Sequence, residues 1–160
     1  MLKQMIKFRE VNINDMNIFF NWINDPLVRT LSFNSEKVEL KVHEKWFLNK
    51  IGDSNCIMLL FFKANDPIGQ VRIKKEALNQ AVISISISNE NRGKGYSVDM
   101  LKKAKKYFLS KNPEFIINAY IKNNNLNSIK SFEKASFKFQ KKINYKGYES
   151  LNYILENDNW

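Results

Sequence analysis

The stretch AVISISISNENRGKGYS, residues 81–97, holds the clearest local pattern in this sequence. Its first half alternates apolar with polar residues, which is typical of a half-buried β-strand over 81–88. Gly93 and Gly95 follow the strand, and apolar residues at helical spacing then predict a helix from Val98 onward. The sequence therefore predicts a strand, a glycine turn and a helix in direct succession.

The glycine turn is the feature to which chemistry can be assigned. Two glycines allow successive backbone N–H groups to point into one concavity, and the following helix directs the positive end of its dipole there. Such a site binds a pyrophosphate with few side chains, and Arg92 and Lys94 add positive charge at its rim. A plain tight turn is the alternative, because two glycines fall short of a P-loop or a dinucleotide-binding fingerprint.

Periodicity and turn residues predict the other elements on both sides of this turn. The predicted strands are 5–9, 55–63, 68–74, 81–88, 115–121, 137–143 and 151–155. The predicted helices are one capped by Asn14-Asp15 and ended by Asp25-Pro26, one from Ser35 or Glu36 to Gly52 with Val38, Val42, Trp46 and, as a further candidate, Phe47 at helical spacing, one from Val98 to about Asn112, and one over 124–134. The order β-α-α-β-β-β-α-β-α-β-β indicates an α+β sheet protein.

Composition narrows the class of protein. The 160 residues, 44% apolar and 26% charged, match one folded domain, which we predict to span 1–160. The longest apolar run, 57–62, is too short to span a bilayer, and residues 1–7 lack the features of a signal peptide. Cys56, the single cysteine, is interpreted as a small buried hydrophobe, so we expect no disulfide and no metal site. Together these features predict a cytoplasmic protein.

The net charge of +10 has two interpretations. Abundant lysines can simply solvate the surface, and this is the interpretation that we favour for most of the charge. A basic surface around a phosphate-rich ligand is the other, and it explains a local part of the charge. The basic residues are spread along the chain and form no single stripe, so nucleic acid is not the expected partner.

Two segments resemble a known enzyme family. Arg92-x-x-Gly95-x-Ser97 resembles the R/Q-x-x-G-x-G/A acetyl-CoA signature of the GNAT acetyltransferases, with Ser97 in the final position. The segments Asn125-x-x-Ser128-Ile129 and Phe132-Glu133-Lys134-Ala135-Ser136-Phe137 resemble the family's N-x-x-S-I…Y-E-K-x-G-F pattern. The resemblance covers nearly the whole chain and implies the GNAT fold: a central, mixed, mostly antiparallel sheet of about seven strands, four main helices and a splay between the middle strands.

The resemblance also implies N-acetyl transfer with acetyl-CoA as the cofactor. The pantetheine arm would lie in a splay between the strands 81–88 and 115–121, and Asn125 and Ser128 would hold it while capping a helix. A β-bulge near Ile87 would present a backbone N–H to the acetyl carbonyl, an oxyanion-type stabilisation. The implied cofactor-binding residues are Ile85, Ile87, Arg92, Gly93, Lys94, Gly95, Tyr96, Ser97, Asn125 and Ser128.

The sequence departs from the family at Phe132, where many members place a tyrosine as general acid. Phenylalanine cannot donate a proton, so Ser131, Tyr120 or a water remains for that role. The Gly of the K-x-G-F pattern is also replaced, by Ser136, which we expect to alter only a turn.

The general base is equally open. Glu90 lies near the end of the strand and is either a base or a solvent-facing acid. Ser84 and Ser86 face away from the isoleucines of their strand, where they serve as polar filler or hold a water that removes a proton. We therefore expect direct attack by the amine with water-mediated deprotonation, and the candidate catalytic residues are Ile87, Glu90 and Tyr120.

Residues 20–29, 32–35 and 43–47 resemble, more loosely, the GNATs of nonulosonic-acid biosynthesis. These enzymes acetylate the 4-amino group of a UDP-linked amino-dideoxy sugar on the pseudaminic-acid route. The resemblance implies substrate contacts from Phe33, His43 and Trp46. Trp46 as a core residue, and His43 as a surface or internally bonded residue, remain the alternatives.

Three functions therefore stay open. Acetylation of a nucleotide-linked amino sugar predicts a closed, aromatic and basic pocket, whereas acetylation of a protein N-terminus predicts an open, acidic groove. The third is a module that binds coenzyme A without catalysis. The expected partner is a small-molecule amine, with no nucleic acid and no membrane, and a homodimer is left open.

Overall fold

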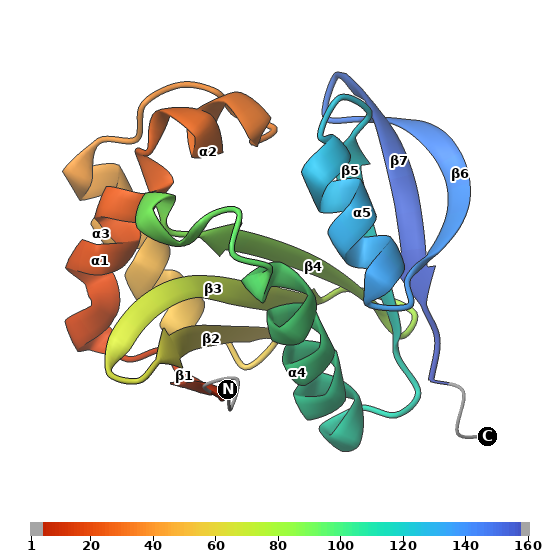
Figure 1. The fold of residues 1–160 in the computed structure, drawn as a ribbon, viewed down its shortest axis with the longest axis horizontal. Coiled ribbons are helices and arrows are strands. Elements are labelled where there is room, and N and C mark those ends of the chain that lie inside the picture. Colours follow the sequence, from red (N-terminus) through yellow and green to blue (C-terminus); the bar gives the residue numbers. More distant parts are fainter. Residues whose placement is uncertain (1–4, 158–160) are drawn as a thin grey trace.

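The computed structural model describes residues 5–157, which form one seven-stranded sheet with helices on both faces (Figure 1). Residues 1–4, part of the N-terminal segment considered above, and 158–160 lie outside this range. The strands are β1 (Ile6–Glu10), β2 (Cys56–Lys63), β3 (Asp66–Lys75), β4 (Gln80–Ile87), β5 (Ile116–Lys122), β6 (Lys138–Tyr145) and β7 (Tyr148–Leu155). The helices are η1 (Ile13–Asp15), α1 (Met16–Ile23), α2 (Pro26–Leu31), α3 (Leu40–Ile51), η2 (Asn89–Asn91), α4 (Tyr96–Lys111) and α5 (Leu126–Lys134).

The strand order β1-β2-β3-β4-β5-β7-β6 contains one parallel pair, β4 with β5. That pair is short, since it joins Gln80–Val82 only to Ile116–Asn118, although β4 continues to Ile87. The other neighbours in the sheet are antiparallel. The mixed, mostly antiparallel sheet and the splay between its middle strands are thus confirmed.

Alternation along β2 shows how the sheet separates two hydrophobic cores. Leu59 and Phe61 belong to the larger core, to which α4 contributes Met100, Leu101 and Phe108. Met58 and Leu60 belong to the second core, with Phe19 of α1 and Phe47 of α3. Figure 1 shows the corresponding layers, with α4 and α5 on one side of the sheet and α1 and α3 on the other. Within residues 5–157, no helix has the length and hydropathy that a membrane span requires.

The first helix, α1, starts directly after Asn14-Asp15 as predicted, with Asp15 at its N-cap, but Asp15 makes no side-chain capping bond to α1. The side-chain cap belongs instead to the preceding turn, η1. Asn12, rather than Asn14-Asp15, caps the turn, because its side chain accepts from the Asn14 N–H while Asp15 accepts from the Asn12 N–H at 2.9 Å. Asp15 also forms two hydrogen bonds with Arg9, at 2.7 and 2.9 Å. The pair with Arg9 orients Asp15 inward, which sequence spacing alone does not indicate.

A fifth α-helix, α2, was not predicted. Asp25-Pro26 begins it instead of merely ending α1: Asp25 accepts from the N–H groups of Leu27 and Val28, and Pro26 occupies the first helical position. We predicted that Pro26 only ends a helix, but proline is also favoured at the first position of a helix.

The predicted second helix starts later than expected, at Leu40. Asn24 both donates to the Val38 carbonyl and accepts from its N–H, so it uses the groups that a helix would need there. Val42 is 60% exposed, while His43 and Phe47 point inward. The buried face of this helix therefore includes the candidate Phe47, but it contains His43 where Val42 was predicted.

Gly69 in β3 is required by close packing, and its replacement by alanine is expected to destabilise the fold. A Cβ there would lie 2.5 Å from the Ser86 carbonyl oxygen and 2.9 Å from the Met100 methyl. Overpacking against backbone costs about 3 kcal/mol, or roughly 6–12 °C in Tm. Thermal unfolding measures the loss. Gly52→Ala is the matched control, because its nearest neighbour is 3.4 Å away; equal losses in both variants would contradict the packing argument.

Candidate active site

The splay exposes backbone donors along the end of β4. The Ser88 N–H donates to the Ile68 carbonyl at 2.9 Å, so the backbone groups of even-numbered residues in β4 form hydrogen bonds with β3. The N–H groups of Ile85 and Ile87 therefore point to the opposite side of β4, toward β5. On that side β5 is paired only as far as Val82, so both donors point into the splay. The bulge expected near Ile87 is absent, because the β3–β4 register runs without a shift from Ala81 to Ile87. Divergence of the strands opens this edge instead.

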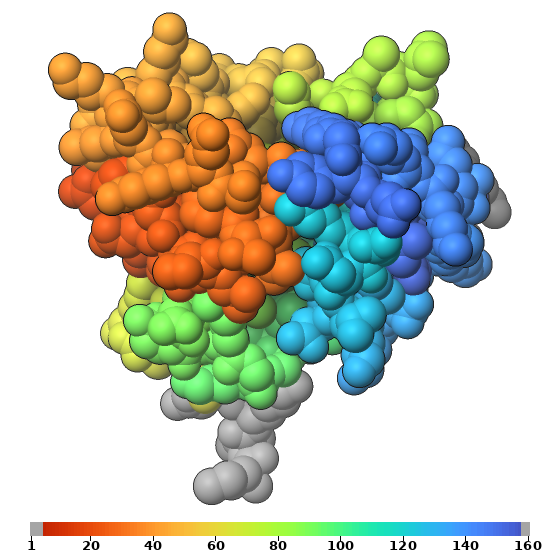
Figure 2. Space-filling view, turned by 90° about the horizontal axis from the view of Figure 1, so that it is seen from above, coloured from red at the N-terminus to blue at the C-terminus, as the bar shows by residue number. Residues whose placement is uncertain are grey.

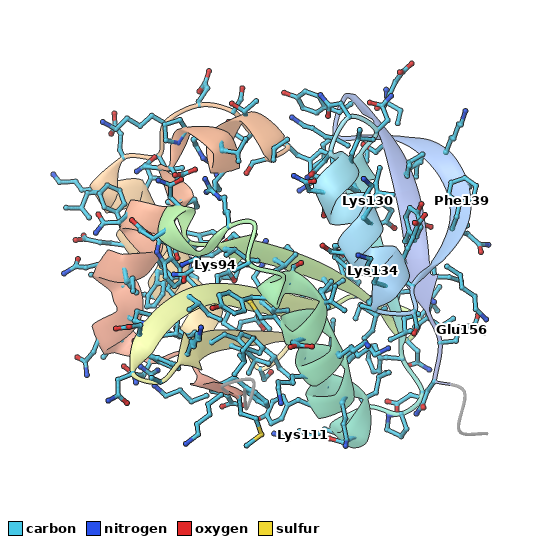
Figure 3. All side chains as sticks on the ribbon, in the orientation of Figure 1. Lys94, Lys111, Lys130, Lys134, Phe139 and Glu156 are labelled. Atoms are coloured by element: carbon cyan, nitrogen blue, oxygen red, sulfur yellow. The ribbon has the colours of Figure 1, made fainter. Side chains whose placement is uncertain are left out.

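The glycine turn leaves an open concavity before α4. Gly93 and Gly95 have φ of 74° and 78°, the left-handed region that favours glycine. A Cβ at either position would meet no atom within 4 Å in the described chain, so the space above the turn is free. Lys94 lies on this loop, and Lys130 and Lys134 lie on α5 (Figure 3). This concavity and the β4 donors fit a pyrophosphate with an extended arm.

The other side chains of the turn are engaged within the protein. Arg92 binds Asp25 at 2.6 Å, and the Tyr96 ring is buried in the larger core. The Ser97 hydroxyl lies 2.7 Å from that of Ser131 on α5. The turn therefore offers a phosphate mainly backbone N–H groups and the helix dipole.

A cavity of about 340 Å³ lies beside the splay. It brings together the predicted substrate residues Phe33, His43 and Trp46 with Tyr120 and with Ile85 of the splay. From above, α2 and the residues after it (orange) lie against the β6–β7 hairpin (blue), and Phe33 packs edge-on against Tyr145 of that hairpin at 4.8 Å (Figure 2). The cavity is thus partly roofed and has a size typical of small-molecule sites.

His43 is held rigidly in the wall between α1 and the cavity. It is 1% exposed, and its Nε2 lies 3.1 Å from the Met16 carbonyl, which assigns the ring proton to Nε2 because a carbonyl only accepts. Nδ1 is buried without a hydrogen-bond partner among the described residues. Burial lowers the pKa of His43, outweighing the opposing effects of the Met16 carbonyl and Glu44.

The lowered pKa of His43 predicts a loss of stability in mild acid. The folded state favours the neutral ring of His43. The contribution of His43 to the free energy of unfolding is therefore complete above the unfolded pKa of about 6.5 and declines as pH falls below that value. Urea unfolding between pH 7.5 and 5.5 is expected to show a falling free energy of unfolding. His43→Gln, which keeps a donor for the Met16 carbonyl, is expected to show a flatter profile; parallel profiles would contradict this assignment.

Gln70 and Arg72 of β3 face the cavity beside Ser84 and Ser86 of β4. The register pairs Gln70 with Ser86 and Arg72 with Ser84, and the Gln70 amide donates to the Ser86 hydroxyl at 3.0 Å. Arg72 stacks over Trp46 at 5.1 Å, and burial lowers its pKa. Its guanidinium has no hydrogen bond or ion pair within the described residues. It is therefore a partly desolvated cation available to an anion.

Positive charge recurs around the cavity. The cationic lining residues are Arg29, Arg72, Lys122 and Lys146, and none of the described lining residues is Asp or Glu. Lys122 is 8% exposed; its Nζ donates to the Thr30 carbonyl at 3.1 Å and lies 3.7 Å from the Tyr148 ring centroid. Burial, and after it the charge of Glu76, raises the pKa values of Tyr120 and Tyr145, but Glu76 does not line the cavity.

The structure separates the candidates for proton transfer. Tyr120 lines the cavity, and burial raises the pKa of its phenol, which keeps it protonated at neutral pH. Phe132 also lines the cavity, but it is 3% exposed and packs edge-on against Phe137, and its ring has no proton to donate. Ser131 donates to the Asn127 carbonyl at 3.0 Å, so its proton is already used.

Glu90 does not reach the main cavity. It is exposed on η2 and lines a second, smaller cavity of about 270 Å³ together with Asp25 and Arg92.

Asn125 caps α5 by accepting from the Ser128 N–H at 3.3 Å, and both residues line the main cavity. Cys56 is half-buried, and no cluster that could hold a metal ion occurs in residues 5–157.

Sequence reasoning missed Arg72, Lys122 and Asp25. The signal for Arg72 was present, because Gln70 and Arg72 alternate with apolar Val71 and Ile73 just as Ser84 and Ser86 alternate with isoleucines. Lys122 carried the same signal, because Tyr120 and Lys122 alternate with the apolar Ala119 and Ile121. Asp25 carried no such signal, since its role depends on a contact with a distant segment.

The model of the family described as "Acetyltransferase (GNAT) domain" matches residues 6–138. The chain belongs to this family. It is an acetyl-CoA-dependent N-acetyltransferase. A search of curated protein sequences finds no significant match.

Solved structures share the GNAT fold at low sequence identity. Spermidine N-acetyltransferase from Vibrio cholerae, in complex with CoA and spermine, superposes with a TM-score of 0.86 at 16% identity, over 97% of each chain. Aminoglycoside acetyltransferase AAC(6')-Ib in complex with coenzyme A gives 0.81 at 16% identity, over 95% of each chain. A domain from Methanocaldococcus jannaschii gives 0.81 at 22% identity, over 96% of this chain and 99% of its own.

Proposed function

We propose that this GNAT enzyme acetylates a primary amine on an acceptor that also carries negative charge, namely the 4-amino group of a UDP-linked amino-dideoxy sugar. The observation that carries the proposal is the charge of the main cavity: four cations and no carboxylate among its described lining residues. Phosphates beside Arg72 and Lys122 would offset charges that otherwise lack a carboxylate partner. Aromatic residues, Phe33 and Trp46 among them, offer faces for a base or a sugar.

The same charge argues against the acceptors of the structural neighbours. Spermine and the aminoglycosides are polycations, and placing a polycation against a cationic cavity costs free energy of binding. It also argues against a protein N-terminus, for which we expected an open, acidic groove. An anionic amine is the acceptor class that this cavity favours.

The chemistry assigned to the chain is positioning with proton transfer. Bound acetyl-CoA supplies the acetyl group as a thioester. The N–H groups of Ile85 and Ile87 face the splay and are proposed to donate to the acetyl carbonyl. Ser84 and Ser86 line the cavity and are proposed to hold the water that takes the amine proton. Tyr120, protonated at neutral pH, is proposed as the proton donor to the leaving thiol.

Release of free thiol from acetyl-CoA tests the proposal against a panel of acceptors. The panel holds a UDP-linked 4-amino sugar, the same sugar without UDP, spermidine, kanamycin and a short peptide. We expect release with the UDP-linked sugar and much slower release with the others. Fastest release with spermidine or kanamycin would overturn the proposal, and binding of acetyl-CoA without release for any acceptor would indicate a non-catalytic module.

A further inference from the structure

An ion pair joins Arg92 of the glycine turn to Asp25, the N-cap residue of α2, which lies 67 positions earlier in the sequence. The Arg92 Nη2 donates to the Asp25 Oδ1 at 2.6 Å, and the two side chains are only 25% and 18% exposed. Charge-assisted bonds of this length are stronger than neutral ones, and partial burial protects them from screening by salt. Arg92 is also the first residue of the acetyl-CoA signature. The pair thus connects the predicted coenzyme site with another element of the fold.

Asp25 holds the start of α2. The same Oδ1 accepts from the N–H groups of Leu27 and Val28, at 3.0 and 3.2 Å. Burial on its own would raise the pKa of Asp25, but the bonds from Arg92 and the backbone outweigh it and lower that pKa, so the carboxylate stays ionised. Val28, Arg29 and Leu31 of α2 line the main cavity. Movement of Asp25 would therefore move a wall of that cavity.

Besides the bonds at Asp25, hydrogen bonds of Arg29 and Thr30 fix α2. The Arg29 guanidinium donates to the carbonyls of Asn34 and Glu36, in the segment after the helix, at 2.9 and 3.2 Å. The helix has six residues, and none of them is buried. At its far end the Thr30 carbonyl accepts from Lys122 of β5 at 3.1 Å. A helix this short gains little from its own hydrogen bonds, so its position depends on these contacts with neighbouring segments.

We propose that Asp25 is a positioning residue. Through its bond to Arg92, it couples the binding of coenzyme at the glycine turn to the ordering of α2. A guanidinium has five N–H groups, and within the described residues Arg92 uses two, toward Asp25 and Asn89. The remaining groups are free to bind a phosphate oxygen while the bond to Asp25 persists. Coenzyme then tightens the bridge that holds α2, and the acceptor wall becomes complete only after coenzyme has bound. The proposal rests on coenzyme binding at the turn, not on the identity of the acceptor.

Amide hydrogen exchange of α2, with coenzyme A as the probe, tests the coupling. The reporters are the N–H groups of Arg29 and Ser32, which bond to the carbonyls of Asp25 and Val28. We expect saturating coenzyme A to slow their exchange at least about 5-fold in the wild type. In Asp25→Asn the amide still caps the helix but lacks the charge, so the slowing is expected to fall below about 2-fold.

Two further variants make the test specific. Arg92→Gln is expected to lose the α2 response as well, and Asp25→Asn/Arg92→Gln is expected to lose no more than either alone. Asp53→Asn changes another Asp that accepts a nearby backbone N–H, on the exposed loop before β2, and is expected to respond like the wild type. A retained response in Asp25→Asn, or no response in a wild type that binds coenzyme A, would overturn the proposal. Failure of the UDP-linked sugar as acceptor would leave this result unchanged, so the two proposals fail separately.

Discussion

Replacing Gly95 by valine is expected to abolish acetyl-CoA binding while the protein stays folded. Gly95 has φ of 78° and is the N-cap residue of α4, and a side chain there would enter the open space in which we propose that the phosphates approach the backbone. Loss of two charge-assisted hydrogen bonds corresponds to about 100-fold or more in affinity. Valine at positive φ also strains the backbone by ~1–2 kcal/mol, or roughly 2–8 °C in Tm. Calorimetric titration with acetyl-CoA and a thermal melt measure both effects.

Gly147 provides the matched control for this prediction. It also has positive φ, 86°, and a Cβ there meets nothing within 4 Å in the described chain, but it lies in the β6–β7 hairpin. Gly147→Val is expected to lose a similar Tm and to keep its affinity for acetyl-CoA. Unchanged affinity in Gly95→Val, or equal loss in both variants, would remove the argument for the phosphate turn.

Replacing Arg72 by glutamine is expected to raise the KM for the anionic acceptor roughly 10- to 100-fold and to leave the KM for acetyl-CoA within about 2-fold. The reason is the loss of a desolvated cation that has no partner of its own in the cavity and that stacks on Trp46. Steady-state kinetics with the UDP-linked sugar measure the change.

Arg72→Lys separates charge from geometry. Lysine keeps the charge but loses the planar fork, so partial recovery is expected. The KM for the same amino sugar without UDP is expected to be nearly equal in wild type and Arg72→Gln, because no phosphate is present. A matching rise for both acceptors would assign Arg72 to a structural role in the cavity wall.

Much of the fold was accessible from local patterns. The alternation over 81–88 and the turn at Gly93 and Gly95 predicted β4 and the start of α4, because strand period and positive φ are local properties of the chain. Ser136 illustrates a limit of that reasoning. It has φ of 73°, which explains why relatives of this pattern carry glycine there, yet serine adopts the conformation when the packing after α5 requires it.

The site was less accessible, because it depends on contacts between distant segments. The prediction placed Arg92 at the rim as a free charge, whereas Asp25 of α2 binds it. Glu90 lies near the expected strand end but turns toward the smaller cavity. The cationic character of the main cavity arises because α2, β3, β5 and the β6–β7 hairpin meet there. Periodicity within one segment contains no information on such a meeting.

The most direct test of the account is the ratio of kcat/KM for one 4-amino sugar measured with and without its UDP group. The amine is the same in both acceptors, so the ratio reports only what the cationic cavity adds. We predict a preference of at least about 100-fold for the UDP-linked sugar, which declines as salt is raised from 50 to about 500 mM. A ratio near one, or faster turnover of spermidine than of either sugar, would contradict the assignment of an anionic acceptor.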